Sequence, residues 1–428
     1  MSVRAFSVAV VVLAIVAIPA TAGAAAITDR VAAVSPPPAA PAATPTAAVP
    51  CPKAVAPKVT RSPRPTPPPS DPEHRVVGGE PLATSGLVVP PGVPAPPRVT
   101  ATSWLVADLD TGTVLGGCGP HEYATPASVQ KLLLAATMLP RLDPQQVIRV
   151  TPEDLEIAPG SSAVGLLPGG RYRVETLWLG LLLQSGNEAA NALARLGGGP
   201  DGAAGGVRAM NEYARHLGAL QTHAVTPSGL DGPGQFTSAY DLALIARACF
   251  ADPTFRRYAL TERTRIPAQR GLGARGFQIQ NENQLVHRYP GALGGKTGFT
   301  DYARHTYVGA AERDGRRLVV TLLGAEPRPQ RGWEQGAALL DWGFRLPREA
   351  GVGRLVEPGE WDAARTPVPP PPALPAPAEA PPVSTTTSAT VDDRPGAGTV
   401  VALAVGAAVI ALAVVAARRI RASGRTRD

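Results

Sequence analysis

The sequence predicts an α+β fold in which both ends of one domain supply the strands of an antiparallel sheet and the middle forms a helical lobe. Strand patterns occur within residues 103–115, helical patterns recur within residues 126–250 around a loop-rich stretch at 141–173, and strand patterns return at residues 293–323. Strands from the two ends bury their apolar faces together when they join one sheet. We therefore expect one domain over residues 99–345, with a functional site between lobe and sheet.

The first strands are predicted from a hairpin pattern. Residues 103–108 and 113–115 are rich in Trp, Leu, Val and Thr, and they flank the turn residues Asp110, Thr111 and Gly112. This hairpin would give the sheet its first two strands.

Helical patterns follow in the middle of the domain. Pro126 and Pro140 bound an apolar run that is typical of a buried helix. Two helical segments within residues 174–196 flank a short loop, and further helical repeats lie at residues 207–217 and 238–250.

The domain ends in strands and one helix. Residues 293–300 predict a strand, and residues 307–311 and 318–323 predict a hairpin around an Asp-Gly turn. A helix over residues 333–342 should then pack on the sheet.

The N-terminal part is predicted to be a signal followed by a linker. Residues 1–22 carry Arg4, an uncharged apolar run and a small-residue cleavage pattern, as a secretory signal does, with an uncleaved anchor as the alternative. Residues 23–98 are dominated by Ala, Pro, Val and Thr. That composition buries no core, so we expect a semi-rigid linker.

The C-terminal part predicts a stalk and a membrane helix. Residues 346–395 are rich in Pro, Ala and Thr, and residues 396–417 carry no charge and are long enough to cross a bilayer. Residues 418–428 contain five arginines, which places this tail in the cytoplasm. We expect a single-pass cell-membrane protein whose domain is extracytoplasmic; a buried core helix is the alternative for the apolar run.

The positive net charge does not by itself indicate a nucleic-acid partner. Of the net +7, the tail 418–428 contributes +4, whereas residues 99–345 carry 24 basic and 22 acidic groups. We therefore expect no basic face on the domain and no nucleic-acid binding.

The three cysteines, Cys51, Cys118 and Cys249, show no metal-ligand spacing. We expect Cys118 and Cys249 to be free buried thiols, with a disulfide between them as the alternative.

A serine and a lysine stand one helical turn apart at Ser128 and Lys131. Residues at this spacing share a helix face, so the Lys131 amine can reach the Ser128 hydroxyl. A serine needs a neighbouring base to become a nucleophile, and burial can make a lysine amine neutral enough to serve. Arginine stays charged and cannot.

Composition supports this interpretation. The 41 basic residues divide into 37 Arg and 4 Lys, and only Lys131 and Lys296 lie in the predicted domain. Both lie where a lysine is chemically required.

Two further motifs carry polar groups, and each has a plain structural alternative. Ser185-Gly186-Asn187 lies between two predicted helices, but Ser185 and Glu188 also fit a capping box. Gly295-Lys296-Thr297-Gly298 lies on a predicted strand, where the lysine could simply be exposed.

Taken together and in this order, the three motifs resemble those of the serine penicillin-recognising acyl transferases, and within them the D-alanyl-D-alanine carboxypeptidases of low molecular mass. The resemblance covers about residues 99–345 and implies a fold like that of the β-lactamases and transpeptidases. It extends to further segments: Gly160-Ser161-Ser162, residues 183–190, Pro227-Ser228-Gly229-Leu230 and Asn281-x-Asn283-x-Leu285.

The resemblance implies roles for the catalytic residues. Ser128 would attack the carbonyl between the two terminal D-alanines of a peptidoglycan stem peptide, and Lys131 would accept its proton. Ser185 would relay a proton to the leaving amine, and Asn187 would hold Lys131 and the substrate amide.

The resemblance also implies a substrate-binding strand. Lys296 and Thr297, with Gly298 and Phe299 beside them, would bind the terminal carboxylate, and the backbone N–H groups of Ser128 and Phe299 would form an oxyanion hole. His305 lies near this strand, and we expect it to be a structural histidine rather than a catalytic base.

The expected protein is a serine-type D-Ala-D-Ala carboxypeptidase that uses no metal or cofactor, acts on peptidoglycan stem peptides and is covalently inhibited by β-lactams. No Glu-x-x-Leu-Asn element lies between Lys131 and Ser185, which argues against rapid β-lactam hydrolysis. A β-lactamase-like or transpeptidase variant and a catalytically silent cell-wall binding protein remain the alternatives.

Overall fold

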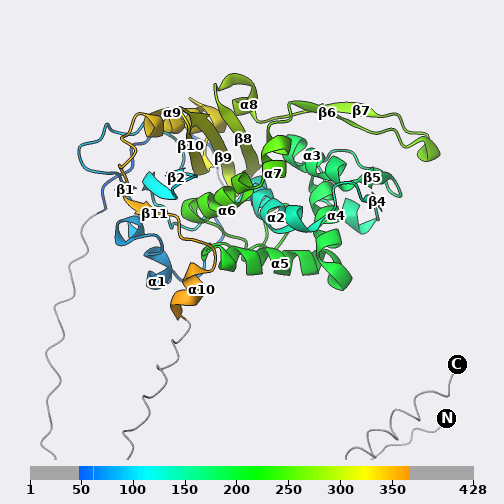
Figure 1. Ribbon diagram of the computed structural model, residues 1–428, viewed down its shortest axis with the longest axis horizontal. Helices are drawn as coiled ribbons and strands as arrows, with labels where there is room; N and C mark the ends of the chain where they lie inside the picture. Colours follow the sequence, from blue (N-terminus) through cyan, green and yellow to red (C-terminus); the bar gives the residue numbers. More distant parts are fainter. Residues whose placement is uncertain (1–47, 61, 366–428) are drawn as a thin grey trace, which may run out of the picture. The chain divides into compact units, whose positions relative to one another are not determined.

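The central feature of the computed structural model, which describes residues 48–60 and 62–365, is a seven-stranded antiparallel sheet (Figure 1). Its strand order is β1-β3-β2-β10-β9-β8, with β11 also paired to β3. The strands are β1 (Leu87–Val88), β2 (Ser103–Asp108), β3 (Thr113–Cys118), β8 (Ala292–Thr300), β9 (Arg304–Arg313), β10 (Arg316–Ala325) and β11 (Gly353–Arg354). Both ends of the domain therefore build one sheet, as predicted.

Helices cover both faces of this sheet, and most of them form a separate lobe beside it (Figure 1). Helix α9 packs on one face, against β9 and β10, while α6 packs on the other, against β2 and β10. The helices are α1 (Pro72–Arg75), α2 (Lys131–Met138), α3 (Val174–Gln184), α4 (Asn187–Gly197), α5 (Gly202–His216), α6 (Ala239–Ala251), α7 (Pro253–Ala259), α8 (Gln284–Arg288), α9 (Gly332–Phe344) and α10 (Glu360–Arg365).

Alternation along the strands produces two hydrophobic cores. Along β2, Trp104 and Val106 belong to the core beneath α9, whereas Leu105 and Ala107 belong to the core shared with the lobe. Successive side chains of a strand point to opposite faces, so a strand buried on both faces is apolar throughout.

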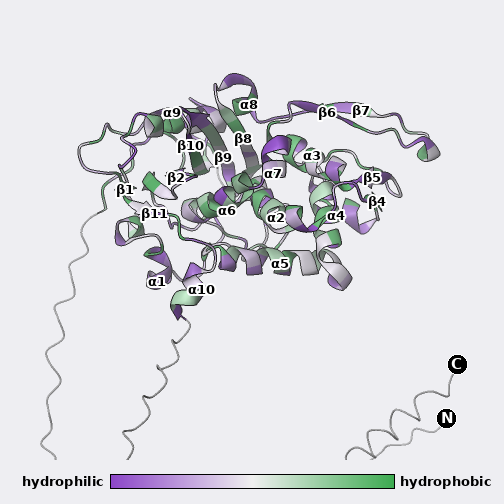
Figure 2. Cartoon of the chain, in the orientation of Figure 1, coloured by the Kyte–Doolittle hydropathy of each residue, from purple (hydrophilic) through white to green (hydrophobic). Residues whose placement is uncertain are grey.

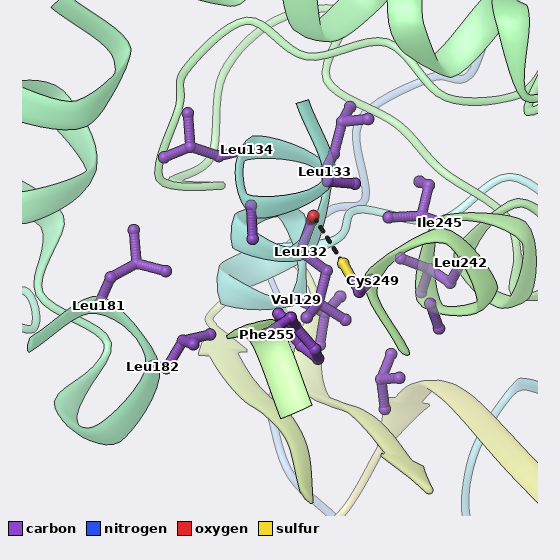
Figure 3. Close-up of a cluster of buried hydrophobic side chains, with 14 of the residues drawn as sticks. Val129, Leu132, Leu133, Leu134, Leu181, Leu182, Leu242, Ile245, Cys249 and Phe255 are labelled. Carbon is purple, nitrogen blue, oxygen red and sulfur yellow. Dashed lines mark hydrogen bonds between the residues drawn. The ribbon is translucent and has the colours of Figure 1, made fainter. Parts of the chain in front are cut away.

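Helix α2 is buried on every side, and this explains its uninterrupted apolar sequence. Figure 2 shows hydrophobic residues concentrated where α2 and α6 lie. Leu132, Leu133 and Leu134 pack among side chains of α3, α6 and α7, and the Cys249 thiol donates a hydrogen bond of 3.2 Å to the Leu132 carbonyl (Figure 3). Rigid packing of this helix fixes the position of its first residue, Lys131.

The predicted strands and helices are confirmed, with one local difference at the first motif. Ser128 does not lie in the α-helix itself but in a 3-10 turn, Ala127–Gln130, that leads into α2. Ala127 has a φ of 49°, which tightens the chain just before Ser128.

The prediction of a linker over residues 23–98 is wrong for the described residues 48–60 and 62–98. Strand β1 pairs with β3, and Val77 and Leu82 are buried in the core. Cys51 is disulfide-bonded to Cys118. This Pro-rich segment is ordered by partners that lie far along the chain, which its composition does not reveal.

The expectation for the cysteines is therefore also corrected. Cys118 pairs with Cys51, so neither a free Cys118 nor a Cys118 to Cys249 bridge is present, while Cys249 is free and buried as expected.

The stalk predicted over residues 346–395 begins later than expected. Residues 346–365 still belong to the folded domain, because β11 pairs with β3 and the side chains of Leu355 and Val356 are buried. Helix α10 follows and ends at Arg365.

Two small hairpins in the lobe were not predicted. Strands β4 (Val147–Arg149) and β5 (Arg171–Arg173) form one, and β6 (Arg263–Ile266) and β7 (Phe277–Gln280) form the other. Each strand has only three or four residues, too few for a clear alternation pattern.

The predicted signal at residues 1–22, the membrane helix at 396–417 and the tail at 418–428 lie outside the described residues. Within residues 48–60 and 62–365, no helix has the length and apolar character needed to cross a bilayer.

We predict that replacing Cys51 with Ser lowers the free energy of unfolding by about 2–4 kcal/mol, because the disulfide closes a long loop, with a sequence separation of 67 residues. Urea unfolding of the variant and of a Cys249→Ala control would measure this. Alkylation in denaturant should label one thiol without reductant and three after reduction; three labelled thiols without reductant would contradict the pairing.

Candidate active site

Ser128 lies at the wall of a cavity between the helical lobe and the sheet, where the sequence placed the site. The cavity has a volume of about 610 Å³. Besides Ser128 it is lined by Ser185 and Asn187, by the loop residues 158–162 and by residues 297–301 at the end of β8. Three motifs that are far apart in the sequence therefore meet at one cavity.

Lys131 is fully buried directly behind Ser128. Its Nζ lies 2.9 Å from Ser128 Oγ, 2.7 Å from Asn187 Oδ1 and 2.8 Å from the Ser228 carbonyl oxygen. The predicted contact between Lys131 and Ser128 is thus present, and the amine also joins α2 to α4 and to the loop that contains Ser228.

The chemical types of these three partners determine what the amine can do. The oxygens of Asn187 and Ser228 can only accept hydrogen bonds, whereas the Ser128 hydroxyl can donate or accept. A neutral amine has two N–H groups and one lone pair. When the two N–H groups bond to the two carbonyl oxygens, the lone pair faces the Ser128 hydroxyl and can take its proton.

The surroundings favour this neutral form. Burial lowers the pKa of Lys131 well below its usual value, and the positive charge of Lys296 acts in the same direction, while Glu188 opposes them. A buried amine without a fully compensating carboxylate loses its proton more readily.

Ser185 and Asn187 come from the junction of α3 and α4. Ser185 ends α3 in the left-handed conformation, with a φ of 62°, and its buried hydroxyl has no hydrogen-bond partner within the described residues. A non-glycine residue in this conformation is strained. In this conformation Ser185 lines the cavity.

The capping-box alternative for Ser185 and Glu188 is wrong. Helix α4 has no side-chain cap, and the buried Glu188 carboxylate instead accepts hydrogen bonds from the backbone N–H groups of Val164, Gly165 and Leu166. The Asn187 N–H donates to the Ser162 carbonyl. Glu188 thereby holds the loop that continues from the cavity wall.

Lys296 and Thr297 occupy neighbouring positions of β8 with different exposures. Thr297 lines the cavity, whereas Lys296 is buried behind it and its ammonium donates to the Thr297 carbonyl at 2.7 Å. Burial lowers the pKa of Lys296 to about 8, against the attraction of Glu282. The alternative of an exposed strand lysine is therefore wrong.

Gly298 allows β8 to approach the Ser128 turn closely. A Cβ atom there would lie 2.8 Å from the Ser128 nitrogen and 2.4 Å from Thr306 Oγ1, so only glycine fits. Phe299 follows with its side chain half exposed at the cavity. The strand thus faces the backbone N–H of Ser128.

The structure adds three residues to the site: Ser228 lies in a segment that the resemblance covers, His305 was expected to be structural, and Asp231 was not singled out. Ser228 contributes only its carbonyl oxygen, which any residue type could supply. Asp231 lines the cavity and accepts a hydrogen bond from Thr300 Oγ1. His305 lines the cavity too, packed against the Phe299 ring, and burial lowers its pKa.

The described residues contain no group of His, Cys, Asp or Glu side chains arranged to hold a metal ion. The arrangement supplies a serine, a base and hydrogen-bond donors, which suits nucleophilic acyl transfer.

Comparison with known proteins agrees with this chemistry. Residues 92–327 match the family described as D-alanyl-D-alanine carboxypeptidase. The chain is 44% identical over 273 residues to the D-alanyl-D-alanine carboxypeptidase DacB2 of Mycobacterium tuberculosis, covering 63% of this chain and 90% of the relative. It is 34% identical to the D-alanyl-D-alanine carboxypeptidase DacD of Escherichia coli, covering 59% of this chain and 65% of that protein.

Solved structures give the same fold. The crystal structure of a D-alanyl-D-alanine carboxypeptidase from Mycobacterium tuberculosis matches with a TM-score of 0.59 and 42% identity, over 63% of this chain and all of that one. The Streptomyces K15 DD-transpeptidase matches with a TM-score of 0.56 and 26% identity, over 59% of this chain and 99% of that one.

We predict that Glu188→Ala lowers the free energy of unfolding by about 3 kcal/mol, because three backbone N–H groups lose a charged acceptor. Glu188→Gln keeps an oxygen in the same place and should cost less than half as much. Urea unfolding of both variants would measure the difference, and an alanine variant as stable as the wild type would contradict the anchoring role.

Proposed function

The chain belongs to the D-alanyl-D-alanine carboxypeptidase family, and we propose that it removes the terminal D-alanine from peptidoglycan stem peptides through an acyl-enzyme on Ser128. The observation that carries this proposal is the hydrogen-bond arrangement around Lys131, whose lone pair can face the Ser128 hydroxyl. The cavity beside it is large enough for the end of a peptide.

Acylation begins when Ser128 Oγ attacks the carbonyl carbon of the peptide bond between the two D-alanines. The hydroxyl proton passes to Lys131 as the new C–O bond forms. The carbonyl oxygen becomes negatively charged, and the backbone N–H groups of Ser128 and Phe299 stabilise it. Gly298 is what permits β8 to lie close enough to Ser128 for both donors to act.

The leaving D-alanine must receive a proton on its nitrogen when the C–N bond breaks. We assign this step to Ser185, because the residue lines the cavity and its buried hydroxyl has no hydrogen-bond partner among the described residues, so it can pass a proton from Lys131 to the amine. Asn187 keeps Lys131 in place throughout.

The substrate carboxylate would bind at β8. Thr297 faces the cavity and can donate its hydroxyl to the carboxylate, while Lys296 acts from behind through its positive charge. A positive Lys296 also keeps Lys131 neutral, since it lowers the Lys131 pKa.

Water then attacks the acyl-enzyme, releases the shortened peptide and returns the proton to Ser128. In a transpeptidase an amine would replace that water. The similarity to the Streptomyces DD-transpeptidase supports transpeptidation as the second candidate activity. A carboxypeptidase transfers the acyl group to water, whereas a transpeptidase transfers it to an added amine.

We also propose that the chain is secreted and held in the cell membrane by residues 396–417, with the catalytic domain outside. What supports this is the uncharged length of that segment and the five arginines that follow it.

We predict that Ser128→Ala abolishes acylation and leaves the free energy of unfolding within about 1 kcal/mol of the wild type, because the residue is at the cavity wall rather than in the core. Intact mass after adding benzylpenicillin, and release of D-alanine from a short peptide ending in D-Ala-D-Ala, would test it.

The outcomes of that experiment separate the alternatives. An adduct on the alanine variant would exclude Ser128 as the nucleophile. A wild-type adduct that disappears within seconds would indicate a β-lactamase, and a folded wild type without any adduct would indicate a silent binding protein.

We predict that the rate of acylation falls above about pH 8, where Lys296 loses its charge and its attraction for the carboxylate. Protonation of Lys131 should lower the rate on the acid side, below its lowered pKa. Lys296→Arg stays charged, so its rate should hold to higher pH while the acid side is unchanged. Acylation rates between about pH 5 and pH 10 would show this; an alkaline limb identical in both proteins would contradict the role of Lys296.

A further inference from the structure

The hairpin β6–β7 presents arginines outward from the lobe. Ile266 and Ile279 are buried on its inner face. Because side chains alternate between the faces of a strand, Arg263 and Arg265 lie on the outer face, and both are exposed. Arg270 and Arg275 lie exposed in the loop between the strands, and residues 263–281 contain no acidic residue.

The hairpin β4–β5 has the same construction. Ile148 and Tyr172 are paired on its inner face and buried. Arg149 and Arg171 are paired on the outer face, directly across from each other, and both are exposed. Like charges directly opposite each other in a sheet are destabilising.

The two hairpins form one surface. The side chain of Gln269, in the β6–β7 loop, accepts a hydrogen bond from the Arg171 N–H and donates one to the Arg171 carbonyl. We name the arginine surface by six of its exposed arginines: Arg149, Arg171, Arg263, Arg265, Arg270 and Arg275.

None of these six arginines forms an ion pair with another residue of the described chain, in contrast to Arg195 nearby, which is paired with Asp154. The expectation of no basic face is therefore wrong: the domain is almost neutral in total, but its charge is unevenly distributed. Repulsion among these arginines lowers the stability of the folded domain, and a bound anion would reduce that repulsion. Guanidinium groups bind carboxylates through paired hydrogen bonds.

The position of the arginine surface indicates which anion it meets. Glu282, two residues after β7, lines the catalytic cavity, and the Phe277 ring lies against Gly165 in the loop that continues from the cavity wall. In Figure 1 the hairpin β6–β7 lies at the opposite side of the domain from α10, where the described chain ends at Arg365. The hairpin that carries most of the arginine surface thus begins beside the cavity, and it is far from α10, where the described chain ends.

We propose that the arginine surface binds the peptidoglycan polymer, through the carboxylates of stem peptides that neighbour the one in the catalytic cavity. Each stem peptide ends in a carboxylate, so a glycan chain of peptidoglycan carries these groups at repeated intervals. Several weak contacts with the arginines then combine into a stronger overall affinity. The inference rests on the proposed function, because the polymer is identified as the material that presents the substrate.

The test compares two triple variants of the full chain, each made with Ser128→Ala so that nothing is turned over. One carries Arg263→Gln, Arg270→Gln and Arg275→Gln. The control carries Arg98→Gln, Arg141→Gln and Arg345→Gln, which removes the same charge from exposed arginines that form no ion pair within the described residues. Binding is measured by co-sedimentation with purified insoluble peptidoglycan freed of other polymers.

We expect the first variant to bind peptidoglycan about tenfold more weakly and the control to bind within about twofold of the parent. Binding by the parent should also weaken as salt is raised. Equal binding by the first variant and the parent would overturn the proposal. So would binding to anionic phosphatidylglycerol vesicles without binding to peptidoglycan, which would indicate a membrane surface instead.

Two further measurements distinguish a loss of catalysis from a loss of polymer binding. With Ser128 present, both triple variants should release D-alanine from a short soluble peptide at the wild-type rate, because they leave the cavity intact. A wild type inactive on that peptide would defeat the proposed function, whereas active enzymes with unchanged polymer binding would defeat only this inference. Arg171→Gln should raise the melting temperature, since it removes the repulsion with Arg149, and yet weaken binding.

Discussion

The burial of Lys131 is the constraint on which the active site depends. An amine enclosed by apolar helices must either be neutralised or be surrounded by acceptors, and here it receives two carbonyl oxygens and one hydroxyl. Those three partners come from α4, from the loop at Ser228 and from the turn that precedes α2. Satisfying one buried nitrogen therefore fixes the relative positions of three segments, and the same geometry aims its lone pair at Ser128.

The packing around α2 makes this arrangement rigid. Every residue of that helix is buried, so Lys131 cannot shift without disturbing the core that α2 shares with α3 and α6. On the other side of the cavity, Gly298 lets β8 pass close to the Ser128 nitrogen. Ser185 lines the cavity in a strained conformation, and Glu188 anchors residues 164–166, which follow the cavity-lining residues 158–162. The contacts that stabilise this part of the fold therefore also position Lys131 and Ser128.

The lobe shows a contrasting use of charge. At the site, Lys131 and Lys296 are buried and close enough for one to lower the pKa of the other. On the outer hairpins, Arg149 is paired with Arg171 and both are exposed, so water weakens their repulsion without removing it and leaves the charges available. Lys131 lies where a proton must be gained and lost, which arginine cannot do, whereas the outer hairpins need only a permanent charge, which arginine supplies.

The sequence by itself determined the order of strands and helices and the three motifs, because hydrophobic period and residue chemistry are local properties. Residue chemistry at helical spacing pointed to Ser128 and Lys131, whereas Ser185 and Asn187 were expected only from the resemblance to a known family. Only the tertiary structure decided that Cys51 pairs with Cys118, that the Pro-rich residues 62–98 pack on the sheet, and that exposed arginines gather on two hairpins. Each of these depends on segments far apart in the chain meeting in space, and neither composition nor spacing records such a meeting.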